Sequence, residues 1–173
     1  MMVFAVFVII LGQVMMIAVY ASRYKRVPPN QALVVYGRKY RPGTAREGFI
    51  VLAGGGKFIV PIIETYSFLS LAPFVVEVRI DDPGGAECEL LATSKLTREP
   101  EGLRRAAQNF VDKPIEEVRA VAATILEGHA RGLLGRKVSP REPEFAEKLE
   151  AVTRPDYDKI GLELVGNMVV RAG

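Results

Sequence analysis

The feature that most constrains this chain is an uninterrupted apolar segment at its N-terminus. Residues 1–21, MMVFAVFVIILGQVMMIAVYA, contain no charged side chain, and Gln13 is the only strongly polar residue among them. As a helix with a rise of about 1.5 Å per residue, the segment would extend roughly 30 Å, the thickness of the hydrocarbon core of a bilayer. The sequence therefore predicts a transmembrane anchor over residues 1–21.

Two other interpretations of this segment are weaker. A secretory signal peptide has a basic residue before its apolar core and a small-x-small cleavage site after it. Here no Lys or Arg precedes the core, and the best candidate site, Val19-Tyr20-Ala21, is a poor one. A core helix of a soluble protein would be shorter and would carry a polar face. We therefore expect a retained, single-pass anchor in the cell membrane.

Basic residues follow the segment at once, and none precedes it. Arg23, Lys25 and Arg26 stand next to the predicted span, together with Tyr24. Because Lys and Arg resist translocation, we expect the rest of the chain on the cytoplasmic side. The candidates for contact with the membrane surface are Arg23, Tyr24, Lys25 and Arg26. Anionic lipids at that surface would attract the three cationic side chains. The alternative is that these charges only set the topology.

Charge and cysteine content restrict the remaining function classes. The formal net charge of +3 arises mainly next to the anchor, since acidic and basic residues roughly balance after Glu47. This distribution does not favour a nucleic-acid-binding face. Cys88 is the only cysteine, so an intrachain disulfide is impossible.

Short apolar runs follow a basic, proline-containing linker at residues 22–31. Two prolines keep Val27–Gln31 extended, and turn residues separate the runs beyond it. We expect strands at residues 32–37, 49–52, 57–63, 66–71, 74–80, 88–96 and 162–170.

The apolar period changes to that of a helix in the second half of the chain. A helix is expected from about Glu99 to Val111, and a second one with Asp112 as its N-cap and Pro114 in its first turn. Phe145, Leu149 and Val152 mark a third, which stops at Gly161. The second helix carries one apolar stripe, made of Ile115, Val118, Ala122, Ile125, Leu126, His129 and Leu133. Strands followed by helices, without βαβ alternation, indicate an α+β fold of mainly antiparallel strands.

Three consecutive glycines raise the question of a phosphate-binding loop. A Walker A loop needs glycine five residues before its Gly-Lys pair and Ser or Thr after it, and it opens a helix. With Gly56-Lys57 as the pair, these positions hold Val51 and Phe58, and a strand-like run follows. We therefore expect Gly54, Gly55 and Gly56, with Pro61, to serve a structural connection between strands.

No constellation of catalytic or metal-ligating residues stands out. His129 is the only histidine, and with Cys88 it lacks the further ligands of a usual zinc site. His129 lies on an apolar stripe, where a packed, hydrogen-bonded side chain is expected. The sequence therefore predicts no enzyme, no metal and no cofactor, with a Cys88–His129 enzyme as the remote alternative.

Several stretches resemble a known family. "VPPNQALVVYGR", "GFIVLAGGGKFIVPIIETYSFLSL", "AAQNFVDKPIEEVRAVAATILEGHARGLLG" and "FAEKLEAVTRPDYDKIGLELV" occur in an order similar to that of the flotillin branch of the SPFH (stomatin/prohibitin/flotillin, band 7) superfamily. The resemblance extends from about residue 22 to residue 166. It implies one SPFH-like domain over residues 32–173, after the anchor at 1–21 and the linker at 22–31.

The resemblance also implies a function. Such proteins are non-catalytic membrane scaffolds that self-associate and gather lipids and partner proteins into microdomains. We accordingly expect membrane lipids and further copies of the chain as partners. The alternative is an anchored adaptor that binds one membrane enzyme, such as a protease. Family members usually continue into a long helical coiled coil, and these 173 residues contain no heptads.

Overall fold

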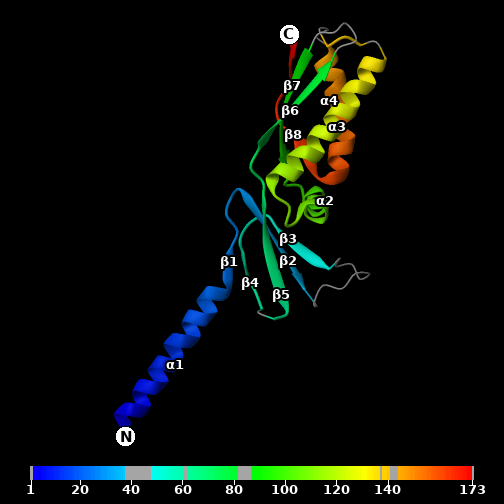
Figure 1. Cartoon of the computed structure of the whole chain (residues 1–173). Coiled ribbons are helices and arrows are strands. Elements are labelled where there is room, and N and C mark those ends of the chain that lie inside the picture. Colours follow the sequence, from blue (N-terminus) through cyan, green and yellow to red (C-terminus); the bar gives the residue numbers. More distant parts are fainter. Residues whose placement is uncertain are drawn as a thin grey trace. The chain divides into compact units, whose positions relative to one another are not determined.

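The computed structural model describes residues 2–37, 48–60, 62–81, 87–136, 138–140 and 144–172. Helices and antiparallel strands occur in the order expected of an α+β chain (Figure 1), so the predicted fold class is confirmed. The chain divides into two compact units, residues Met1–Ser67 and Phe68–Gly173.

The first unit contains the N-terminal helix and short strands. They are α1 (Met2–Arg23), β1 (Tyr24–Arg26), β2 (Gln31–Gly37), β3 (Phe49–Leu52), β4 (Gly56–Phe58) and β5 (Glu64–Ser70), whose last three residues belong to the second unit. β1 pairs with β4 in one antiparallel sheet, and β2 lies between β3 and β5 in another. β1 lies inside the segment expected to be a linker.

The core of the first unit explains why β2 is apolar from Ala32 to Val35. Leu33 and Val35 pack with Ile59, and the partly buried Ile50 and Leu52 of β3 lie against this cluster. Ala32 and Val34, which point to the opposite face of β2, are buried as well, so neither face of the strand is exposed to water from Ala32 to Val35. A strand buried on both faces shows a continuous apolar run in place of an alternating one.

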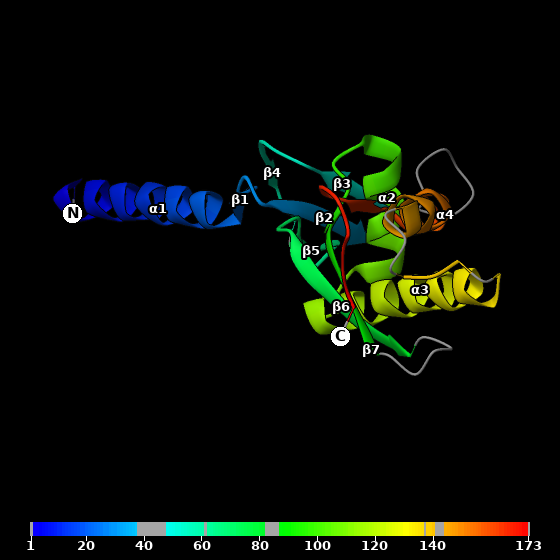
Figure 2. The same cartoon turned by 90° about the horizontal axis from the view of Figure 1, so that it is seen from above.

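The second unit is a small sheet covered by helices. Its elements are β6 (Phe74–Asp81), β7 (Glu87–Leu96), α2 (Pro100–Phe110), α3 (Ile115–Gly135), α4 (Glu144–Ile160), β8 (Leu162–Leu164) and β9 (Val169–Ala172). β7 is central: β6 pairs antiparallel with one edge of it, and β8 and β9 pair with the other. α3 packs on β6 and on α4, and the view from above shows both helices on the same side of the β6–β7 pair (Figure 2).

The alternating pattern of β6 and β7 positions this helical layer. Every second residue of β6, from Phe74 to Ile80, is buried, as is every second residue of β7, from Cys88 to Leu96. Because side chains alternate between faces, these residues form one buried face of the sheet. On the helices, the side chains that complete this core include Leu126, Leu149 and Tyr157.

Four sequence expectations require correction. The run at residues 57–63 is a strand only to Phe58. The expected final strand is two strands, β8 and β9, because Gly166 adopts φ +72° between them. Pro114, and not Asp112, occupies the N-cap position of α3, and Asp112 has φ +61° in the preceding turn. Ile125 is half-buried, whereas its neighbour Leu126 is fully buried.

Candidate membrane-facing site

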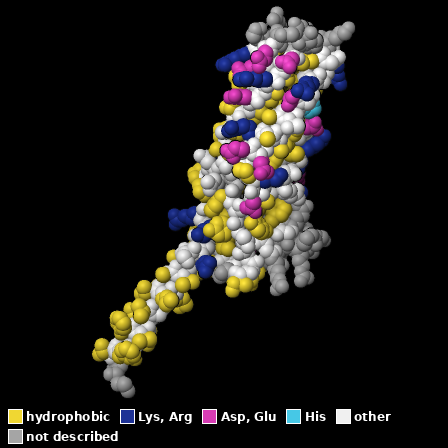
Figure 3. Space-filling model, in the orientation of Figure 1, with side chains coloured by type: hydrophobic (Ala, Val, Ile, Leu, Met, Phe, Trp, Pro, Cys, Tyr) yellow, Lys and Arg dark blue, Asp and Glu magenta, His cyan; other side chains and the backbone are white. Residues whose placement is uncertain are grey.

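The apolar helix α1 is exposed from Val3 to Arg23. Within this stretch an 18-residue window has a mean hydropathy of 2.6, and none of that window is buried against the rest of the chain. The space-filling view shows hydrophobic side chains along the helix and Lys and Arg side chains where it meets the strands (Figure 3). By length and composition the helix can cross a membrane, and a core helix of the same composition would be buried.

The junction between α1 and the strands is closed by specific contacts. The ring of Tyr20 on α1 stacks on that of Phe58 on β4, with the ring centroids 4.8 Å apart. The N–H of Ile59 donates to the carbonyl of Arg23 at 3.1 Å, which continues the β1–β4 ladder to the last residue of the helix. These contacts join the end of α1 to a folded sheet, without a flexible spacer.

The four residues expected at the membrane surface lie at this junction. Arg23, Tyr24 and Arg26 are exposed. Lys25 is half-buried, and its Nζ lies 5.4 Å from the centroid of the Tyr66 ring, within the range of a cation–π interaction. Three of the four side chains are therefore open to solvent, and the fourth is partly committed to an aromatic neighbour.

The glycines lie between and at the start of strands. Gly54 and Gly55 separate β3 from β4, and Gly55 has φ +77°, a conformation that favours glycine. Gly56 is the first residue of β4 and pairs with Arg26; a Cβ there would lie 2.5 Å from Oη of Tyr24 and 2.9 Å from the carbonyl oxygen of Lys25. Pro61 lies outside the described residues.

An apolar tip between β4 and β5 was not expected from the sequence. Val60, Ile62 and Ile63, which we call the apolar tip, are all exposed, and Ile62 is fully exposed at φ +74°. A β-branched residue at positive φ is unusual and has to be held there by its surroundings. The two isoleucines stand where a polar turn would be ordinary, and that composition is the sequence feature that could have revealed the tip.

Glu64 holds this turn in place. Its buried carboxylate accepts hydrogen bonds from the N–H of Val60 and from Nζ of Lys57, each at 3.1 Å. In return, the N–H of Glu64 donates to the carbonyl of Val60 at 2.9 Å. The reciprocal bonds between Val60 and Glu64 close the turn, so the exposed side chains of the tip project from a fixed backbone.

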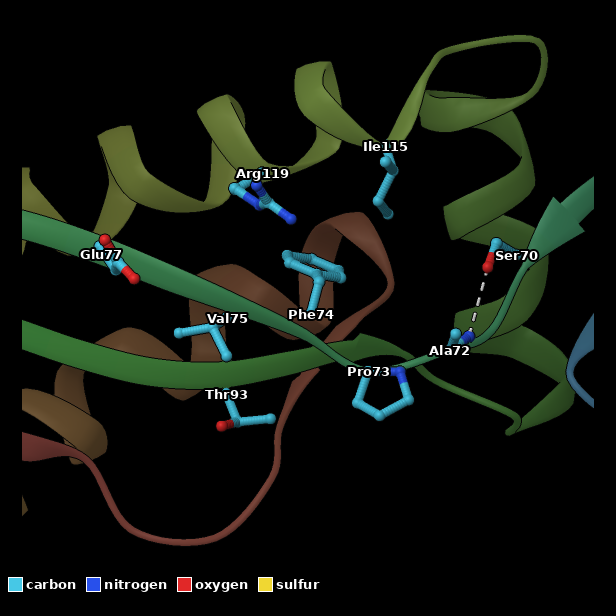
Figure 4. A pocket seen from close by; sticks show the side chains of 9 residues that line it. All are labelled: Ser70, Ala72, Pro73, Phe74, Val75, Glu77, Thr93, Ile115 and Arg119. Carbon is cyan, nitrogen blue, oxygen red and sulfur yellow. Dashed lines mark hydrogen bonds between the residues drawn. The ribbon is translucent and has the colours of Figure 1, made fainter.

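In the second unit a hollow lies beside β6. Its volume is about 810 Å³, and Ile115 and Arg119 extend from α3 toward the side of the hollow where Phe74 of β6 lies (Figure 4). Glu77 of the same strand also lines it. The lining mixes apolar and charged side chains. Among the described residues no group of His, Cys, Asp and Glu is arranged to hold a metal ion.

His129 and Cys88 lie on different elements and make different contacts. Nε2 of His129 lies 2.9 Å from Oδ2 of Asp156, so the histidine joins α3 to α4. Lys159, at 2.7 Å, and then His129 lower the pKa of Asp156 from its ordinary value. Cys88 is buried on β7 as part of the sheet's inner face.

Known proteins resemble the chain over most of its length. No protein-family model matches it. It is 24% identical over 164 residues to the flotillin-like protein FloT of Bacillus subtilis, and the aligned region covers 87% of this chain and 32% of FloT. It is 28% identical over 148 residues to human Flotillin-2, and the aligned region covers 80% of this chain and 34% of that protein. It is 26% identical over 152 residues to human Flotillin-1, and the aligned region covers 79% of this chain and 33% of that protein.

The chain is a relative of the flotillins. Since α1 contributes only 22 of the 173 residues, the similarity of this flotillin relative rests mainly on its folded units. The resemblance found in the sequence motifs is thereby confirmed. The chain spans about a third of the length of the curated relatives it matches.

Proposed function

We propose that this flotillin relative is a non-catalytic scaffold, anchored in the cell membrane, that self-associates and organises lipids and partner proteins into microdomains. One observation carries the proposal: an unburied apolar helix of membrane-spanning length leads directly into a flotillin-like folded body. The contacts at Tyr20 and Arg23 join the helix to the first unit of that body, which suits an anchor that positions a scaffold.

The division of the chain and its orientation are part of this proposal. Residues 1–21 act as the anchor, 22–31 as the juxtamembrane segment and 32–173 as the SPFH-like body. Arg23, Lys25 and Arg26 follow the span and no basic side chain precedes it, which favours a cytoplasmic body. Arg23 and Arg26 are exposed at the end of α1, where they can meet anionic headgroups.

The apolar tip supplies a second contact with the membrane. Val60, Ile62 and Ile63 belong to the same unit as α1, and Figure 1 shows the β4–β5 connection at the end of that unit from which α1 leaves. Transfer of exposed aliphatic side chains from water into the interfacial region of a bilayer lowers the free energy of the system. The tip would thus fix the orientation of the first unit against the membrane surface.

Single-molecule imaging tests the scaffold proposal. The full chain carrying one fluorophore is incorporated into vesicle-derived supported bilayers, and photobleaching steps are counted in each spot. We expect discrete clusters with several steps a spot. Uniform spots that bleach in single steps would contradict the scaffold and leave the anchored adaptor of one membrane enzyme as the better description.

A further inference from the structure

Strand β6 forms an open edge of the sheet in the second unit. Among the strands that the structure describes, β6 pairs with β7 alone. On the other edge of β7, the N–H of Val165 donates to the carbonyl of Thr93 at 2.8 Å, so Thr93 directs its backbone groups away from β6. Its partner on β6 is Val75, whose N–H and C=O groups therefore point away from β7, toward the open edge. Since the direction alternates along a strand, the same holds for Glu77, Arg79 and Asp81.

The side chains of these same residues are exposed on the outer face of the sheet. Along the strand they read Val75, Glu77, Arg79 and Asp81, that is, apolar, negative, positive and negative. The hollow beside the strand lies against this edge, because Phe74 of the inner face and Val75 and Glu77 of the outer face all line it. A row of exposed backbone donors and acceptors is a template for another strand.

We propose that this edge binds the same edge of a second copy of the chain, antiparallel, with the two-fold axis at Val78. The inference rests on the self-association in the proposed function and names the surface for it. In this register Glu77 of each copy lies opposite Arg79 of the other, and Val75 lies opposite Asp81. Because an antiparallel two-fold contact is self-complementary, one favourable pair is formed twice.

The charge pattern selects this register over its neighbours. A two-fold axis at Glu77 would place two glutamates opposite each other, and one at Arg79 would do the same with two arginines. Like charges directly opposite across strands are unfavourable. Axes at Val76 or Ile80 shorten the paired segment, since β6 runs only from Phe74 to Asp81. The axis at Val78 joins the longest charge-compatible segment.

The contact would also continue a row of charges that already crosses the sheet. Arg79 pairs with Glu89 of β7, and Glu89 pairs with Arg171 of β9, with 3.8 Å between Oε2 of Glu89 and Nη1 of Arg171. In the paired assembly Glu77 of the second copy follows Arg79, so the signs alternate from one sheet into the next. On the inner face, Val76 would lie opposite Ile80 and extend the buried apolar layer.

Charge reversal tests the contact on the detergent-solubilised full chain. We compare wild type, Glu77→Arg and Arg79→Glu, each alone and as an equimolar mixture of the two variants, by analytical ultracentrifugation. Each variant alone places like charges opposite each other, and we expect its self-association constant to fall by about tenfold or more. In the mixture, the two arginines on β6 of the first variant face the two glutamates on β6 of the second, so association is expected to return. Asp158→Arg, an exposed reversal on α4, is the matched control and is expected to associate like wild type.

The outcomes separate this contact from the function on which it rests. Loss in both variants with recovery in the mixture supports the β6 contact and shows that both variants are folded. Unchanged association of either variant, or no recovery in the mixture, overturns the contact while leaving a self-associating scaffold through another surface. A wild-type chain that is monomeric at every concentration overturns both the contact and the self-association.

Discussion

Tyr157 joins α4 to α3 through a buried hydrogen bond. Its Oη donates to the carbonyl of Ala122 at 2.9 Å, and burial raises the pKa of the phenol to about 12 from an ordinary value of 10.0. The folded chain therefore holds this proton more tightly than the unfolded chain does. The resulting stability is fully present below pH 10.0 and is lost as the pH rises toward about 12.

Replacing Tyr157 by Phe should remove this alkaline dependence. The variant should lose about 1 kcal/mol at neutral pH, where the hydrogen bond is missing, and its stability should fall less steeply than that of wild type above pH 10.0. Urea unfolding of the solubilised chain at neutral and alkaline pH measures both effects, with Tyr24→Phe, an exposed position, as control. An equally steep alkaline decline in Tyr157→Phe and wild type would contradict the assignment.

Glu64, the first residue of β5, is expected to contribute to the stability of the fold. Glu64→Ala leaves the N–H of Val60 and Nζ of Lys57 without the carboxylate that both contact, and we expect a loss of about 1–3 kcal/mol in the free energy of unfolding. Glu163→Ala removes a more exposed carboxylate, paired with Lys95 at 3.4 Å, and should cost at most about 1 kcal/mol. Equal losses for the two variants in urea unfolding would show that Glu64 does not hold the turn.

At the scale of elements, α1 carries the prediction that follows most directly from the sequence. Ile9 lies near the middle of the helix, and Ile9→Arg places a charge where insertion scales give a cost of about 2.5–3.5 kcal/mol. We expect less of this variant than of wild type to stay in membranes after alkaline carbonate extraction. Ile9→Leu serves as the control, and equal retention of Ile9→Arg would argue against a spanning helix.

The apolar tip is tested separately from the anchor. Ile62→Ser and Ile63→Ser together remove two exposed aliphatic side chains without touching the core of the first unit. An environment-sensitive fluorophore attached near the tip should report a more polar surrounding in vesicles for the variant than for wild type, while carbonate extraction leaves both in the membrane. Identical emission from the variant and from wild type in vesicles would exclude insertion of the tip.

Some elements could be predicted from sequence because their residues repeat with one period. The alternation of β6 and β7 and the apolar stripe of α3 correctly indicated buried faces, since a single sheet face and a single helix side meet the core. The end of β4 at Phe58 and the break at Gly166 were missed. β4 ends where its partner β1 begins, at Tyr24, and the second break lies at Gly166 with φ +72°. In the sequence an apolar run continues across each of these points.

The candidate site was predictable only in part, for a similar reason. The exposed Arg23 and Arg26 follow from their place after an apolar span. The apolar tip and the carboxylate of Glu64 that closes it depend on hydrogen bonds between β5 and the turn before it. Apolar residues such as Ile62 and Ile63 read as strand in the sequence, and only the structure shows them exposed on a turn.

For the molecule as a whole, the proposed function rests on two features, an exposed apolar helix and a flotillin-like body. In our proposal the helix provides attachment, and the edge of β6 provides the surface through which copies join. Neither feature needs a reactive side chain. We propose that the function depends on where the body is held and on what it binds.

Self-association of the chain can be tested by measuring the mass of the full chain in detergent. Size-exclusion chromatography with light scattering separates the protein mass from that of the bound detergent. We expect a discrete species whose protein mass is a multiple of the 19.0 kDa of one chain. A species of 19.0 kDa at every concentration would contradict it, because a monomer cannot organise a membrane by self-association.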